Sequence, residues 1–129
     1  MRILKTAWFM RFTRTEGIDD AVLLECADRA NLGLTHARLG GGLVKQRIAR
    51  RGQGRSGGYR GILAFRAGHL AVFLYGYAKK DRSDSRPDEV AQLKKLAKHL
   101  LRLTNDQLDD LVARNGLEEV RYGGAEVRE

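Results

Sequence analysis

Hydrophobic residues in the first quarter of the chain follow a helical period. They recur at Val22, Leu23, Cys26, Ala27 and Ala30. Asp19 and Asp20 precede this stripe and suit a helix N-terminus, by capping and by the helix dipole. Gly33 follows the stripe as a stop signal. We therefore predict a helix over residues 19–31.

The segment before this helix fits either a strand or a helix. Ile3 and Leu4 can begin a short strand. Trp8, Phe9 and Phe12 fit strand alternation or, at their four-residue spacing, one helical turn. The sequence leaves this choice open.

The middle of the chain has the pattern of β-strands. Imperfect alternation predicts a strand over residues 43–50, and runs rich in β-branched and aromatic residues predict two more, over 59–66 and 70–77. Residues 67–69 suit a tight turn between the last two strands. We expect the glycine-rich segment 51–58 to be a long connection. Together these features predict an antiparallel three-stranded meander.

The last third of the chain carries two amphipathic helices. Pro87, with two acidic residues after it, suits the first turn of a helix. The apolar stripe of that helix consists of Val90, Leu93, Leu96, Ala97, Leu100 and Leu101. A capping box from Thr104 to Gln107 begins a second helix, and residues 117–122 can form a last strand. A small antiparallel sheet, with possible edge strands, packed against N-terminal and C-terminal helices makes an α+β fold.

Length and composition narrow the class of protein. A chain of 129 residues suits one domain, over residues 1–129. The single cysteine, Cys26, excludes an intramolecular disulfide and fits a reducing compartment. The longest apolar stretch, residues 70–77, is much shorter than the roughly 20 residues of a spanning helix. We therefore expect a cytoplasmic protein without a membrane partner.

The charge is concentrated in one central block. The net charge is +8, and residues 29–80 contain 11 basic residues and no acidic one. The rest of the chain holds 13 basic and 16 acidic residues, a net charge of −3. A surface of one sign attracts phosphate polymers. The block therefore indicates a nucleic-acid partner.

Cofactor and metal motifs are not supported. Gly52, Gly54 and Gly57 spell G-x-G-x-x-G, but a strand rather than a helix is predicted after them, so a dinucleotide is not expected there. Three histidines and Cys26 show no ligand spacing, and we expect no metal or other cofactor. The position of Cys26 on an apolar stripe indicates a small buried hydrophobic residue.

Cationic and aromatic side chains form the candidate site. Strand ends of an antiparallel sheet can bring them to one concave face, where tyrosines beside cations can stack on bases. Tyr75 and Tyr77 alternate with a glycine and so share a face. The cations of this set are Lys45, Arg47, Arg50, Arg51, Arg55, Arg60, Lys79, Lys80 and Arg82.

Three runs in this part of the chain carry a family resemblance. They are VKQRIAR at 44–50, GQGRSGGYR at 52–60 and YGYAKK at 75–80, followed by a long Leu/Lys helix. These runs resemble the signature of RelE/HigB-type toxins of the RelE/ParE superfamily. The likeness covers residues 3–120 and is closest to RelE-like toxins paired with helix-turn-helix antitoxins.

The resemblance implies a function. It implies a RelE-like α+β domain that cleaves mRNA, typically on translating ribosomes, and a cognate helix-turn-helix antitoxin that holds it inactive. Arg60 matches the family's phosphate-contacting arginine, and Lys79 or Lys80 matches a basic residue after the last meander strand. The family's earlier basic residues are matched by some of Lys45, Arg47, Arg50, Arg51 and Arg55.

One catalytic role has no matching residue. Well-known members use a C-terminal tyrosine or histidine, whereas residues 84–87 here are Asp-Ser-Arg-Pro. Cleavage without a metal uses the RNA 2′-hydroxyl as nucleophile, and arginine forks suit the phosphate while a base takes the proton. We expect a lysine of the block, Tyr75 or Tyr77 to act as this base. Two alternatives remain: a non-catalytic basic nucleic-acid-binding module, and a gyrase-directed ParE-type toxin on the same fold.

Overall fold

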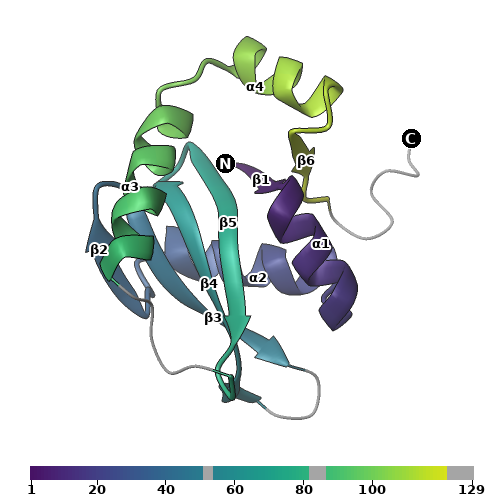
Figure 1. Ribbon diagram of the computed structural model, residues 1–129, viewed down its shortest axis with the longest axis vertical. Coiled ribbons are helices and arrows are strands. Elements are labelled where there is room, and N and C mark those ends of the chain that lie inside the picture. The colour runs from purple at the N-terminus through teal and green to yellow at the C-terminus, as the bar shows by residue number, and fades with distance from the viewer. Residues whose placement is uncertain (51–53, 82–86, 122–129) are drawn as a thin grey trace.

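The chain forms one six-stranded sheet with helices on both faces (Figure 1). The computed structural model describes residues 1–50, 54–81 and 87–121. Its elements are β1 (Arg2–Thr6), α1 (Ala7–Glu16), α2 (Asp20–Asn31), β2 (Ala37–Gly40), β3 (Leu43–Arg50), β4 (Gly54–Arg66), β5 (Leu70–Ala78), α3 (Pro87–Leu101), α4 (Asn105–Ala113) and β6 (Leu117–Glu119). The strand order is β2-β3-β4-β5-β1-β6, and the predicted α+β class is confirmed.

The predicted meander forms the centre of this sheet. Strands β3, β4 and β5 pair antiparallel in sequence order. Three further strands extend it: β2 pairs with β3, β1 runs parallel to β5, and β6 pairs with β1. The sheet is therefore mixed rather than purely antiparallel. The open choice at the N-terminus is also resolved, because β1 runs directly into α1.

The largest differences from the predicted strand boundaries lie at the start of β4 and at the end of β6. Strand β4 begins at Gly54, inside the segment expected to be a long connection, and Gly54 pairs with Arg50 of β3. The register shifts between Ile48 and Arg50, which marks an irregularity that lets the hairpin continue. Glycine tolerates such backbone geometry, so its presence did not end the strand. At the other end, β6 stops at Glu119 rather than residue 122.

Alternation along the strands creates a core on each side of the sheet. Helices α1 and α2 pack on the core that includes Phe9, Leu23 and Phe73. Helices α3 and α4 pack on the core that includes Leu4, Ile62 and Leu100 (Figure 1). Packing of one side of each helix against the sheet supplies most of its stability, since isolated helices of this length are marginal in water.

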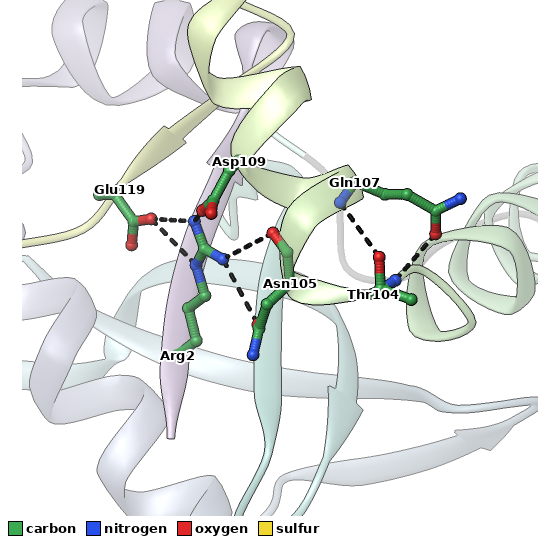
Figure 2. Close-up of polar contacts among 6 residues, drawn as sticks. All are labelled: Arg2, Thr104, Asn105, Gln107, Asp109 and Glu119. Atoms are coloured by element: carbon green, nitrogen blue, oxygen red, sulfur yellow. Dashed lines mark hydrogen bonds and ion pairs between the residues drawn. The ribbon is translucent and has the colours of Figure 1, made fainter.

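Side chains cap the predicted N-termini of α2 and α4. The Asp19 side chain accepts a hydrogen bond from the Val22 backbone N–H, so α2 begins one residue later than predicted. Thr104 and Gln107 form the predicted capping box, with hydrogen bonds of 2.9 and 3.1 Å (Figure 2). Each cap satisfies backbone donors that the first helical turn leaves without partners.

An arginine at the start of the chain fastens the C-terminal elements to the sheet. Arg2 of β1 lies 2.5 Å from a Glu119 carboxylate oxygen of β6 and 2.7 Å from Asp109 of α4 (Figure 2). Its guanidinium also donates to Asn105. Charge-assisted hydrogen bonds are stronger than neutral ones. This cluster therefore helps to hold α4 and β6 against β1.

Candidate functional site

Cations and tyrosines meet where the three meander strands run side by side. Arg47 of β3 lies opposite Arg60 of β4, which lies opposite Tyr77 of β5. Lys45 lies in the next row, which ends at Tyr75. Directly opposed residues point to the same face of a sheet, and this is the face on which α3 packs. We define Lys45, Arg47, Arg60, Tyr75 and Tyr77 as the cationic face.

The members of the cationic face differ in exposure. Arg60, Tyr77 and Lys45 are 3%, 5% and 8% exposed, whereas Arg47 is exposed. One guanidinium nitrogen of Arg60 donates to the Tyr59 carbonyl oxygen at 3.2 Å. Arg47 is therefore placed to meet a ligand first, while Arg60 contributes its charge from beneath.

Burial makes the Arg60 charge costly in the free protein. Desolvation, followed by repulsion from Arg47, lowers the pKa of Arg60 from its ordinary value, and Tyr77 partly opposes this. A guanidinium nevertheless stays charged at physiological pH. Like charges directly opposite each other destabilise a sheet. An anion bound between the two guanidiniums relieves that repulsion, so the geometry fits a phosphate.

His36, one of the three histidines without metal-ligand spacing in the sequence, belongs to this neighbourhood. Desolvation and four cations, Arg47, Arg60, Lys45 and Lys79, lower its pKa from the ordinary 6.5. The Gln46 side-chain oxygen accepts the His36 backbone N–H at 2.9 Å. His36 and Arg47 also line a pocket of about 430 Å³. The signal available in the sequence was its position inside the acid-free block.

An aromatic row runs along one side of the cationic face. The rings of Trp8 and Tyr75 lie 4.6 Å apart between centroids, and those of Tyr75 and Tyr77 lie 6.2 Å apart. Trp8 stands in the first turn of α1 and is 40% exposed. Trp8, at the exposed end of this row, offers a stacking surface for a base. Sequence analysis did not include Trp8 in the site.

The remaining predicted site residues are only partly placed. Lys79 follows β5, donates its backbone N–H to Gly58 and acts electrostatically on His36. Lys80 lies next to it in the turn and is exposed. The side chains of Arg50 and Arg55 lie outside the described part of the structure, as do Arg51 and Arg82 entirely.

Other chemistries find little support in the described residues. Burial raises the pKa of the Cys26 thiol to about 12, so this cysteine is not a nucleophile. Within residues 1–50, 54–81 and 87–121, no group of three or more His, Cys, Asp or Glu side chains could hold a metal ion. Over the same ranges, no helix is both long and apolar enough to cross a membrane.

Comparison with known proteins places the chain in a family. Residues 1–120 match the family model described as the RelE toxin of the RelE / RelB toxin-antitoxin system. The chain therefore belongs to the RelE toxin family, as its sequence motifs indicated. Its class is that of a toxin that pairs with an antitoxin. No curated protein and no solved structure matches the chain.

Proposed function

We propose that this toxin is a metal-independent endoribonuclease that cleaves mRNA. The observation that carries the proposal is the buried Arg60 opposite the exposed Arg47, with Tyr77 in the same row. RelE-family toxins are generally ribonucleases that inhibit translation. A pair of planar guanidiniums suits the equatorial oxygens of a phosphate that gains charge as the chain is cut.

Different residues of the cationic face have different roles in RNA binding and cleavage. Arg47 and Arg60 hold and stabilise the phosphate, with Lys45, Lys79 and Lys80 adding positive charge. Trp8 and the partly exposed Tyr75 stack the bases next to the cleaved bond, and the buried Tyr77 supports the Tyr75 ring from within the row. Arg50, Arg51, Arg55 and Arg82 are assigned to contacts with the flanking RNA.

His36 takes the proton from the 2′-hydroxyl. An imidazole is the usual general base near neutral pH, and the lowered pKa keeps this one neutral and able to accept a proton at pH 7. His36 is exposed beside Arg47 and so can reach a bound substrate. A lysine of the block, Tyr75 or Tyr77, which the sequence suggests, stays the second candidate for this role.

The proposal extends to the partners. The toxin acts in the cytoplasm on mRNA held by translating ribosomes, and a helix-turn-helix antitoxin neutralises it. An acidic antitoxin segment complements the charge of the 29–80 block. The described elements share one sheet, which supports a single toxin domain.

Substitution of Arg60 tests the catalytic proposal. We expect Arg60→Ala to reduce mRNA cleavage by about 10²-fold or more, because it removes a preorganised charge at the phosphate. The measurement is mapping of mRNA cuts by primer extension after induction, with circular dichroism to check the fold. Arg11→Ala, an exposed arginine of α1, is the matched control.

The same assay separates the alternatives. Codon-associated cuts that disappear in Arg60→Ala support the ribonuclease. DNA breaks without mRNA cuts would assign the toxin to gyrase. If the protein binds RNA but causes neither mRNA cuts nor DNA breaks, it is a non-catalytic binding module. Full toxicity of well-expressed Arg60→Ala would remove Arg60 from the mechanism.

A further inference from the structure

A second group of cations lies beside α3, away from the cationic face. Five basic side chains line a groove of about 610 Å³ between α3 and the turns at one end of the meander. Phe65 and Leu101 also line it. We define this α3 groove by its cations, which are Arg66, Lys94, Lys95, Lys98 and Arg102.

The turn between β2 and β3 makes room for the groove. Gly40, Gly41 and Gly42 all have positive φ angles, which favour glycine. A Cβ on Gly42 would lie 2.6 Å from Leu101 Cδ1, and one on Gly41 would lie 3.3 Å from Lys94 Cγ. The three glycines therefore let α3 lie directly on the turn, with the Lys94 stem across it.

The groove concentrates positive charge without an internal counter-charge. Within the residues that the structure describes, none of the five cations forms an ion pair, and no acidic residue lines the groove. Lys94 and Lys98 stand four residues apart, a spacing at which like charges repel on a helix. The helix dipole favours Lys98 in the last turn but gives no reason for Arg66 on β4. An external anion supplies that reason.

The two cationic regions are related by the sheet. Arg60 and Arg66 belong to the same strand and are six residues apart, so alternation points both side chains to the same face. The core residues Ile62 and Ala64 lie between them. Six residues of strand span about 20 Å. One long anionic polymer can therefore contact both regions at once.

We propose that the α3 groove binds the phosphate backbone of RNA outside the cleaved position. This inference rests on RNA being the substrate, and it adds a second contact region to the cationic face. Lysines suit phosphates as point charges and carry no base specificity. The groove therefore contributes affinity and orientation, while the cationic face determines where the chain is cut.

The test compares two double substitutions that remove the same charge. Lys94→Gln/Lys98→Gln changes the groove, and Arg11→Gln/Arg14→Gln changes exposed arginines of α1. Fluorescence anisotropy measures the binding of a labelled RNA hairpin and of a single-stranded RNA over a range of salt concentrations. We expect the groove variant to bind the hairpin about tenfold more weakly, with the slope of log K against log salt reduced by about 2. The α1 variant is expected to bind as the unchanged protein does.

Three outcomes would overturn the inference. They are unchanged RNA affinity in the groove variant, an equal loss in the α1 variant, and loss of antitoxin binding alone, which would assign the groove to an acidic protein segment. Failure of the ribonuclease proposal has a different signature. In that case neither the unchanged protein nor any variant cleaves RNA, yet the groove variant still binds RNA more weakly than the unchanged protein.

Discussion

At the residue scale, the cationic face contains a pair of like charges that lowers the stability of the free protein. Arg60 is buried opposite another guanidinium, and its lowered pKa records the cost of holding charge there. Buried charges are retained in proteins when they are paired or used. A phosphate that enters between Arg47 and Arg60 changes a repulsive pair into a bridged one. Binding and stability should therefore respond in opposite directions to the same substitution.

Arg47→Gln is expected to show this opposition. Removing one of two opposed like charges should raise the free energy of unfolding by up to about 1 kcal/mol, while RNA affinity falls. Urea denaturation and anisotropy measure the two quantities. Arg38→Gln, an exposed arginine on β2, is the control and should change neither by much. A variant that loses stability together with affinity would contradict this account.

His36 gives the cleavage reaction its expected pH dependence. Because its pKa lies below 6.5, His36 is neutral near pH 7, and lowering the pH through that pKa protonates the base. Cleavage should therefore decline on the acid side. His36→Gln should lower the rate by about 10²-fold or more and remove this acid limb. The measurement is the rate of RNA cleavage as a function of pH.

Two controls test the His36 assignment. His69→Gln, in the β4–β5 turn, should leave the profile unchanged. Arg47→Gln should move the acid limb to higher pH, because one of the cations that lower the His36 pKa is gone. An acid limb that survives in His36→Gln would assign the base to another residue.

At the element scale, the close approach of α1 to β5 positions the aromatic row. A Cβ on Gly76 would lie 2.7 Å from Phe12 Cε2 and 3.0 Å from Phe9 Cε1. Gly76 stands between Tyr75 and Tyr77, so the same stretch of β5 carries site residues on one face and receives α1 on the other. The helix can lie this close only because the position lacks a side chain.

Gly76→Ala is expected to displace α1 and to destabilise the protein by about 1–3 kcal/mol, the usual cost of overpacking a core. Trp8, the single tryptophan, stacks on Phe12 and packs against Tyr75, so its fluorescence should also change. Thermal unfolding and emission spectra measure the two effects. Gly116→Ala, where an added Cβ meets only ordinary contacts, serves as the control. Equal stability of the two variants would show that the core absorbs the methyl group.

At the scale of the whole molecule, the two ends of the described chain meet on one side of the sheet. Strand β1 lies between β5 and β6, so residues 2–6 hold the C-terminal elements in place. The buried Lys5 of β1 adds a 2.8 Å ion pair with the partly exposed Asp20 at the start of α2. The cationic face lies on the meander strands, and the α3 groove lies between α3 and the end of β4.

Arg2→Met should weaken the attachment of α4 and β6 to β1 without changing RNA binding. Losing the charge-assisted bonds to Glu119 and Asp109 should cost about 1–2 kcal/mol of stability and increase amide exchange in α4 and β6. RNA affinity should stay unchanged. Arg114→Met breaks only an exposed pair with Asp110 and should have little effect. The measurements are hydrogen exchange and RNA anisotropy, and reduced RNA affinity in Arg2→Met would show that the two regions are coupled.

The sequence by itself determined the local elements and the charge. Helical and strand periods gave α2, α3, α4 and the meander because those signals depend on near neighbours along the chain. The residue types alone show the acid-free block over residues 29–80. The sequence motifs show the resemblance to RelE toxins and single out Arg60. The short strand β2 was missed because four residues carry almost no periodic signal.

Only the tertiary structure decided what those elements bring together. Parallel insertion of β1 beside β5 joins residues about 70 positions apart, which no local pattern encodes. The register that places Arg47, Arg60 and Tyr77 in one row, the approach of His36 and Trp8, and the groove beside α3 all follow from long-range packing. The sequence therefore determined that the chain carries a cationic block for a phosphate polymer. Tertiary packing divides this block between the cationic face and the α3 groove. The reason is that helices cover both faces of the sheet, and their positions determine which side chains meet.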